Sequence, residues 1–279
     1  MHFFFGFFES STVLPLFLVG GGRMILIGII VFFITLVLSM LGKGGGEFFV
    51  PIFLAYGIPY HQAASASLFI LMISGFMMML IYHRKALIDW YTGLILIASV
   101  ASGSFLGGLV SAKISVTVLK ITFSILLFIS AFLISRKKES LNVKVGPTLK
   151  RKCCNEEYEI PLLIIIPSVF AIGFVAGMVG ISGGGLIVPL LIILGNMPIR
   201  LAFATNSLMV LFSATTGFIG KGLSVGINWK FNITVAIFAS IGSLIGSSLS
   251  TKVKTENLKK IFIYVILIAA IWMMVKVFI

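Results

Sequence analysis

The chain has 279 residues, of which 59% are hydrophobic and only 10% are charged. Soluble globular domains carry about 25% charged residues, so this chain has too few charges to cover a water-facing surface and is predicted to lie in a membrane. Its formal net charge of +13 does not indicate nucleic-acid binding, because excess lysine and arginine in a membrane protein reports topology and contact with anionic lipid headgroups.

Apolar stretches follow one another along the chain. A hydrocarbon core about 30 Å thick needs about 20 apolar helical residues, and segments of roughly this length are expected at 24–41, 63–82, 90–112, 115–135, 161–179, 201–219, 229–251 and 257–279. Two shorter apolar pieces, at 48–56 and 186–194, follow glycine clusters and cannot cross a bilayer alone. Residues 1–22 are expected to form an interfacial or an additional membrane segment.

The only extended polar stretch is a charged linker, residues 136–160. It separates a first membrane repeat, 23–135, from a second, 161–279. The linker carries 7 of the 21 basic residues and 4 of the 8 acidic ones. Cytoplasmic loops are enriched in lysine and arginine, so the linker is expected on the cytoplasmic side of the cell's inner membrane.

The two repeats share a sequence pattern. Residues 40–57 align with 178–195 at a shift of 138, with seven of 18 positions identical, and 89–123 align with 228–262 at a shift of 139, with nine of 35 identical. Tryptophan, proline, glycine and lysine recur at matched places, which apolar composition alone does not produce. The pattern predicts an all-α polytopic membrane protein built from two homologous halves, as many secondary transporters are.

The lysines at 252, 254, 259 and 260 indicate how the halves are related. If the halves were parallel, this loop would lie opposite the cytoplasmic linker, against the positive-inside rule. We therefore expect inverted repeats. Inversion requires an odd number of crossings in each half, which is satisfied if the glycine-broken segments are re-entrant.

Glycine triplets are the strongest candidates for a site. Consecutive glycines break a helix, and free backbone N–H groups in hydrocarbon must be buried in protein or line a polar cavity. A following helix would present its N-terminus there, which favours an anion. The alternative is close helix packing through small residues. The expected substrate-binding residues are Lys43, Gly44, Gly45, Gly46, Ser65, Ser67, Ser182, Gly183, Gly184, Gly185, Thr205, Asn206 and Ser207.

The polar residues of this set could have structural roles in place of substrate binding. Serine and threonine hydroxyls can donate to an oxyanion or bond back to their own helix. Lys43 could attract an anion, and Glu47 could carry a proton in a coupled cycle, or the two could simply pair at a water-exposed turn. Lys221, like Arg84, is expected to be a headgroup-level anchor.

The paired blocks resemble the sulfite exporter TauE/SafE family of membrane permeases (toluenesulfonate uptake permeases). The matching residues are 42–51 with 64–68, and 180–189 with 204–208. The resemblance implies a secondary transporter of small sulfur-containing oxyanions such as sulfite or organosulfonates, often exported across the inner membrane. The charged Lys43 and Glu47 depart from the usual neutral cluster of that family.

Two other functions stay open from the residues alone. One is an anion channel with the same site, and the other is a non-transport membrane assembly protein. No nucleophile–base pair suggests an enzyme, the three histidines are not spaced for a metal, and no cofactor is expected. The adjacent Cys153 and Cys154 are not expected to form a disulfide. The expected partners are membrane lipids and a small anion.

Overall fold

The computed structural model describes residues 21–119, 121–122, 125, 128–129, 148–154, 156–222, 228–250, 252–254, 256–257, 260–261 and 264. Five helices in this part are long and apolar enough to cross a membrane: α4 (Tyr60–Arg84), α5 (Trp90–Ser111), α7 (Leu162–Val179), α9 (Ile199–Gly222) and α10 (Trp229–Ser250). A sixth apolar helix is α2 (Gly21–Ser39), and two short ones are α3 (Gly46–Ala55) and α8 (Gly184–Ile193). The chain is a multi-pass, mostly helical membrane protein, as its composition predicts.

Three expected membrane segments, 1–22, 115–135 and 257–279, lie at least half outside the described residues. The other expected spans correspond to described helices with ends shifted by a few residues. The two short pieces begin earlier than expected, because Gly46 and Gly184 are themselves the first residues of α3 and α8. The preceding residues, Gly45 (φ 106°) and Gly183 (φ 71°), have a left-handed backbone conformation that residues other than glycine rarely adopt.

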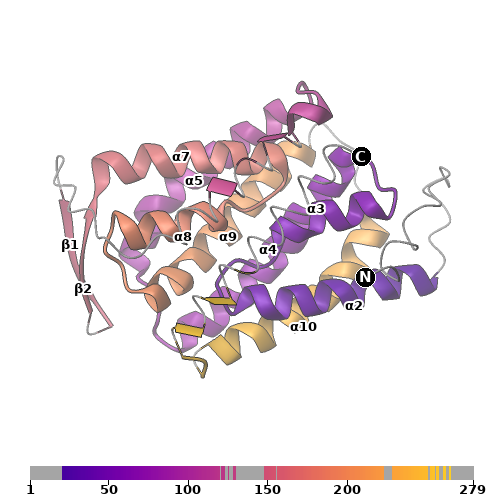
Figure 1. Cartoon of the computed structure of the whole chain (residues 1–279). Helices are drawn as coiled ribbons and strands as arrows, with labels where there is room; N and C mark the ends of the chain where they lie inside the picture. Colours follow the sequence, from indigo (N-terminus) through magenta and orange to yellow (C-terminus); the bar gives the residue numbers. More distant parts are fainter. Residues whose placement is uncertain are drawn as a thin grey trace.

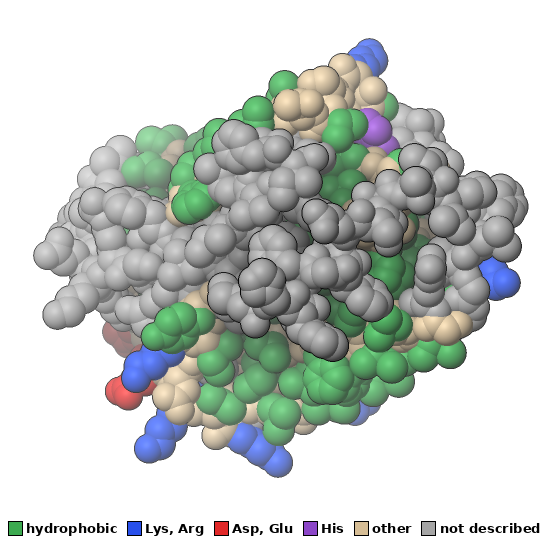
Figure 2. All heavy atoms as spheres, turned by 45° about the vertical axis from the view of Figure 1, so that its right-hand side comes forward, with side chains coloured by type: hydrophobic (Ala, Val, Ile, Leu, Met, Phe, Trp, Pro, Cys, Tyr) green, Lys and Arg blue, Asp and Glu red, His purple; other side chains and the backbone are tan. Residues whose placement is uncertain are grey.

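The outer surface is apolar, as a lipid-facing surface must be. Figure 2 shows a face on which hydrophobic side chains dominate the described part and basic side chains lie mainly at its margins. Exposed residues such as Leu94, Ile233 and Ile237 each keep more than half of their side-chain area accessible. In a soluble protein such patches would promote association; here they fit contact with lipid tails.

Helices from different halves pack closely through glycines. Gly107 of α5 lies against Phe174 of α7, and Gly246 of α10 lies against Leu36 of α2; a Cβ at either glycine would overlap a backbone carbonyl. These two glycines occupy matching positions in the repeats, so one small-residue contact is used twice. For them the packing interpretation is the right one.

The two long central helices, α4 and α9, run antiparallel (Figure 1). Gly75 lies against Leu211, whereas Gly217, further along α9, lies near Leu68, earlier in α4. By contrast, α2 runs parallel to α10 and α5 parallel to α7, because residue numbers rise together along those contacts. Helices α4 and α9, which match between the repeats, thus pack side by side in opposite directions at the centre.

Part of the predicted linker forms a β-hairpin, which the sequence analysis did not predict. β1 (Thr148–Cys153) pairs antiparallel with β2 (Glu156–Pro161), at the left of Figure 1. Lys150 pairs with Glu159 (3.2 Å) and Lys152 with Glu157 (3.0 Å) on the exposed side. On the inner side, Tyr158 packs into the apolar cluster of α5, α7, α8 and α9, which fixes the hairpin to the helix ends.

Candidate functional site

The chain leaves α2 through residues 40–45, here called the first glycine turn. The backbone N–H of Lys43 donates to the carbonyl of Leu38 (3.1 Å), and Gly45 leads into α3. Gly42 packs directly on α9, because a Cβ there would overlap the carbonyl oxygen of Phe203. A helix of the second half therefore completes the turn of the first half.

The second glycine turn, residues 178–183, has the reciprocal arrangement. Gly180 ends α7 in a left-handed conformation, and a Cβ on it would lie 2.5 Å from the Cβ of Ala64 in α4. The hydroxyl of Ser213 donates to the carbonyl of Ser182 (3.1 Å), and Gly183 leads into α8. Here a helix of the first half covers the turn of the second.

The short helices α3 and α8 also pack against the opposite half of the chain. Val188 of α8 is buried in a cluster with Leu41 of the first glycine turn. Its repeat partner, Val50 of α3, is buried in a cluster with Val179 and Ile181 of the second glycine turn. Each short helix thus packs against the turn of the other half.

Asn206 connects the two glycine segments. Its amide nitrogen donates to the carbonyl oxygen of Gly42 (2.7 Å), and a Cβ built on Gly184, the first residue of α8, would lie 2.7 Å from that nitrogen. Its other amide atom, Oδ1, is buried and has no hydrogen-bond partner in the described part of the chain. The structure therefore brings the first glycine turn and the N-terminus of α8 to one side chain.

The predicted hydroxyl residues divide into two kinds. Ser65 and Ser67 in α4 are buried, and their hydroxyl oxygens have no partner among the described residues. In α9 the matching hydroxyls are used within the protein: Thr205 Oγ1 accepts from the backbone N–H of Asp89 (3.2 Å), and Ser207 Oγ donates to Ala204 (2.6 Å). Of these four described hydroxyls, those of Ser65 and Ser67 are the ones without a protein partner.

Lys43 and Glu47 form an ion pair, with 2.6 Å between Lys43 Nζ and Glu47 Oε1. The pair is not at a water-exposed turn, because the lysine is fully buried and the glutamate nearly so. Desolvating two charges is costly, and removing one partner leaves the other charge uncompensated. The second carboxylate oxygen, Oε2, has no hydrogen-bond partner in the described residues.

Lys221 is not a headgroup anchor, contrary to the sequence-based expectation. It is fully buried in α9, where its Nζ donates to the carbonyl of Met178 (2.9 Å) and to Ser111 Oγ (2.8 Å). The basic residue was predicted to lie at the bilayer surface because it follows an apolar run. The missed signal is its place within one residue of the position in α9 that matches the buried Tyr82 of α4.

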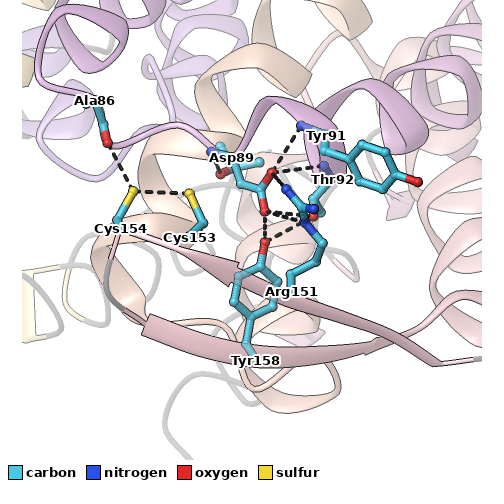
Figure 3. A network of polar contacts seen from close by, with 9 residues as sticks. Ala86, Asp89, Tyr91, Thr92, Arg151, Cys153, Cys154 and Tyr158 are labelled. Atoms are coloured by element: carbon cyan, nitrogen blue, oxygen red, sulfur yellow. Dashed lines mark hydrogen bonds and ion pairs between the residues drawn. The ribbon is translucent and has the colours of Figure 1, made fainter.

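Asp89 is the centre of a polar network at the hairpin (Figure 3). Its carboxylate caps α5 by accepting from the backbone N–H groups of Tyr91 (3.0 Å) and Thr92 (3.2 Å). It also accepts a short hydrogen bond from the Tyr158 hydroxyl and pairs with Arg151, with 3.3 Å between Asp89 Oδ1 and the guanidinium. The sequence analysis did not identify this network, because its partners come from segments far apart in the chain.

The network couples the hairpin to the helix bundle. Burial alone would raise the pKa of the Asp89 carboxyl, but hydrogen bonds from Tyr158 and Arg151 outweigh burial and hold that pKa below its ordinary value. The backbone N–H of the same residue reaches Thr205 in α9. Asp89 therefore joins the hairpin, α5 and α9 at one end of the molecule.

No metal centre is evident. Among the described residues, no three His, Cys, Asp or Glu side chains lie together as a metal site would require. Cys153 and Cys154 are free thiols with 3.1 Å between their sulfur atoms, and Cys154 contacts the carbonyl of Ala86 (3.0 Å). The cysteine pair thus lies on the hairpin, against the loop between α4 and α5.

Comparison with known proteins identifies the family of the chain. The family model described as "Sulfite exporter TauE/SafE" matches residues 27–273. The chain belongs to this family. It is therefore a membrane transporter and not an enzyme.

Curated relatives of this TauE/SafE transporter carry similar descriptions. It is 26% identical over 244 residues, 82% of this chain and 89% of the relative, to "Probable membrane transporter protein YunE" of Bacillus subtilis (strain 168). It is 24% identical over 262 residues, 89% of each chain, to "Probable membrane transporter protein MJ0441" of Methanocaldococcus jannaschii. No solved structure matches the chain significantly.

A pH-dependent loss of stability is predicted for Asp89→Asn. Because the folded-state pKa of Asp89 is depressed, its carboxylate stabilises the fold above the ordinary aspartate pKa of about 3.9, and this contribution disappears as the pH falls through the folded value. At pH 7 the variant should lose about 2 kcal/mol of stability, and at pH 3 the loss should be smaller. Thermal unfolding in detergent measures both, with Glu156→Gln, at an exposed position of the hairpin, as the control. An equal loss at both pH values would contradict the role of the charge.

Replacing Lys43 alone should destabilise the fold more than replacing both Lys43 and Glu47. Lys43→Met leaves Glu47 buried without its partner and should cost about 3–5 kcal/mol, whereas Lys43→Met with Glu47→Leu should recover much of the loss. Detergent melting temperatures give the comparison, and Arg84→Met, at an exposed position, is the control. If the double variant is less stable than the single one, the carboxylate does not depend on Lys43.

Proposed function

We propose that this transporter moves small sulfur-containing oxyanions, such as sulfite or organosulfonates, by alternating access around a site at the two glycine turns. The observation that carries the proposal is the meeting of the first glycine turn and the N-terminus of α8 at Asn206. The family description supplies the substrate class. Export across the inner membrane is the direction that this description favours.

The chemistry of the turns suits an oxyanion. The first N–H groups of a helix have no partners within the helix and carry a partial positive charge. α3 and α8 each begin at a glycine inside the protein, so their donors can approach a ligand without side chains in between. Such donors, together with the Ser67 hydroxyl, would bind a tetrahedral or pyramidal oxyanion from several directions.

Glu47 is the candidate for coupling transport to protons. Its carboxylate is almost fully buried at the start of α3, and one oxygen lacks a described partner. A buried carboxylate inside a membrane marks a proton or substrate pathway more often than a structural feature. Protonation of Glu47 would weaken its ion pair with Lys43 and change the local charge during the cycle.

Inverted repeats would supply the two states of alternating access. The antiparallel course of α4 and α9 supports this relation, since a twofold axis along the membrane normal would make matching helices parallel. The reciprocal contacts of the glycine turns also support it. In such transporters one half rocks against the other around a fixed site.

The hairpin end of the molecule is proposed to face the cytoplasm. Three contacts join its parts: Arg200 donates to Val253 (2.7 Å), Lys85 to Ser248 (2.8 Å) and Cys154 to Ala86. Basic residues gather there, namely Arg84, Lys85, Lys150, Arg151, Lys152, Arg200, Lys252 and Lys254. The positive-inside rule then favours a cytoplasmic hairpin.

Flux assays in proteoliposomes test the proposed function. Wild-type protein should take up radiolabelled sulfite or an organosulfonate with saturation and exchange between the two sides, and a pH gradient should alter the rate if Glu47 couples protons. Gly184→Val, which displaces Asn206, should weaken binding about ten- to a thousandfold, since charge-assisted hydrogen bonds contribute about 1.5–3 kcal/mol each. Asn206→Leu should have a smaller effect.

The matched control for Gly184→Val is Gly22→Val, because a Cβ at Gly22 has no neighbour within 4 Å. Normal transport by Gly184→Val would reduce the glycines to helix packing and refute the proposed site. Unsaturable flux without exchange would indicate an anion channel. The absence of any anion flux would favour an assembly protein.

The orientation is tested by single cysteines in a variant with Cys153→Ser and Cys154→Ser. We expect Lys150→Cys and Lys254→Cys to be protected from an impermeant maleimide in intact cells, and Lys230→Cys, at the start of α10, to react. All three positions are exposed, so accessibility reports the side of the membrane. Reaction of Lys150→Cys together with Lys230→Cys would overturn the inverted arrangement.

A further inference from the structure

The two broken helices, α2 and α7, have matching caps. At the end of α2, the Tyr82 hydroxyl donates to the carbonyls of Ser39 (2.9 Å) and Met40 (3.3 Å), and Ser250 donates to Met40 (2.7 Å). At the end of α7, Lys221 donates to the carbonyl of Met178 and to Ser111. Met40 matches Met178 at the 138-residue shift and Ser111 matches Ser250 at the 139-residue shift, so Tyr82 and Lys221 donate to equivalent carbonyl groups.

Capping does not require a charge. Tyr82 and Ser250 satisfy the carbonyl groups of α2 with neutral hydroxyls, yet the same place in the second half holds a lysine. Lys221 is fully buried, and no described carboxylate forms an ion pair with it, unlike Lys43. An ammonium group has three N–H donors, of which two have the partners given above. A buried cation in a membrane is costly unless it binds something.

Polar atoms without partners lie at the same level of the bundle. Gly217 of α9 lies near Leu68 of α4, so one helical turn further along this antiparallel pair Lys221 is level with Ala64 and Ser65. The Ser65 hydroxyl is buried and has no described partner. The charge of Lys221 also acts on the imidazole of His61, one turn before Ser65.

We propose that Lys221 and Ser65 form a second anion-binding position beside the second glycine turn, at the end of the molecule opposite the hairpin. This proposal rests on the proposed function and adds a position for the same class of substrate, a small sulfur oxyanion. The anion accepts hydrogen bonds from Lys221 Nζ and the Ser65 hydroxyl and neutralises the buried charge. Since the first half has Tyr82 at the matching place, this position exists in one half only.

The test exchanges the lysine for the residue used by the other half. Lys221→Tyr keeps a donor for the Met178 carbonyl but removes the charge. We expect its melting temperature without anion to stay close to that of the wild type, while equilibrium binding of radiolabelled sulfite weakens at least about tenfold. Lys221→Arg should keep the affinity within a few-fold. Wild-type affinity in Lys221→Tyr would overturn the proposal.

A second variant covers the case in which Lys221→Tyr does not fold. Ser65→Ala removes a hydroxyl that has no described partner, so it should leave stability unchanged and still weaken sulfite binding several-fold; unchanged binding would overturn the proposal.

Failure of the proposed function is recognised separately by testing wild-type protein with sulfite, an organosulfonate, phosphate and nitrate. Binding of only the last two refutes the sulfur substrate, and the variants are then compared with the anion that binds. Binding of none refutes both proposals.

Discussion

The constraint on which this structure depends is that a membrane protein whose helices are broken must satisfy the hydrogen bonds of its own backbone. Hydrocarbon offers no hydrogen bonds, so every N–H and C=O exposed by a broken helix needs a protein partner or a ligand. The carbonyl groups at the ends of α2 and α7 receive donors from Tyr82, Ser250 and Lys221. At the other side of each break, α3 and α8 begin at the buried residues Gly46 and Gly184, which is where the proposed anion would bind.

The halves satisfy this constraint for each other. Gly42 lies against Phe203 of α9, and Gly180 lies against Ala64 of α4, so each turn is covered by a helix from the opposite repeat. The small residues are required because the backbones approach too closely for any side chain. Asn206 then adds a contact that the first half cannot return, since Ala66 stands at its matching place. The repeats share a backbone plan but differ in their polar groups.

Most of the fold could be predicted from the sequence, and part of the site could not. Apolar length and the paired glycine and proline positions predicted the helices, the breaks and the duplication. Lys221 was misinterpreted, because a lysine at the end of an apolar run looks the same whether its amine reaches the bilayer surface or a carbonyl of another helix. The network of Asp89, Arg151 and Tyr158 was also missed, since its members meet only after the hairpin docks on the helix ends.

The pairing of α2 with α10 has a consequence for how the protein is made. α2 is the first helix described and α10 is encoded some 200 residues later, yet Gly28, Gly242 and Gly246 lie in direct contact between them. During synthesis the early helix must wait in the bilayer, with the face that packs on α10 uncovered, until nearly the whole chain has been inserted. Biogenesis therefore ends, rather than begins, with the docking of α2, and a chain truncated before α10 would leave that face open to other membrane helices.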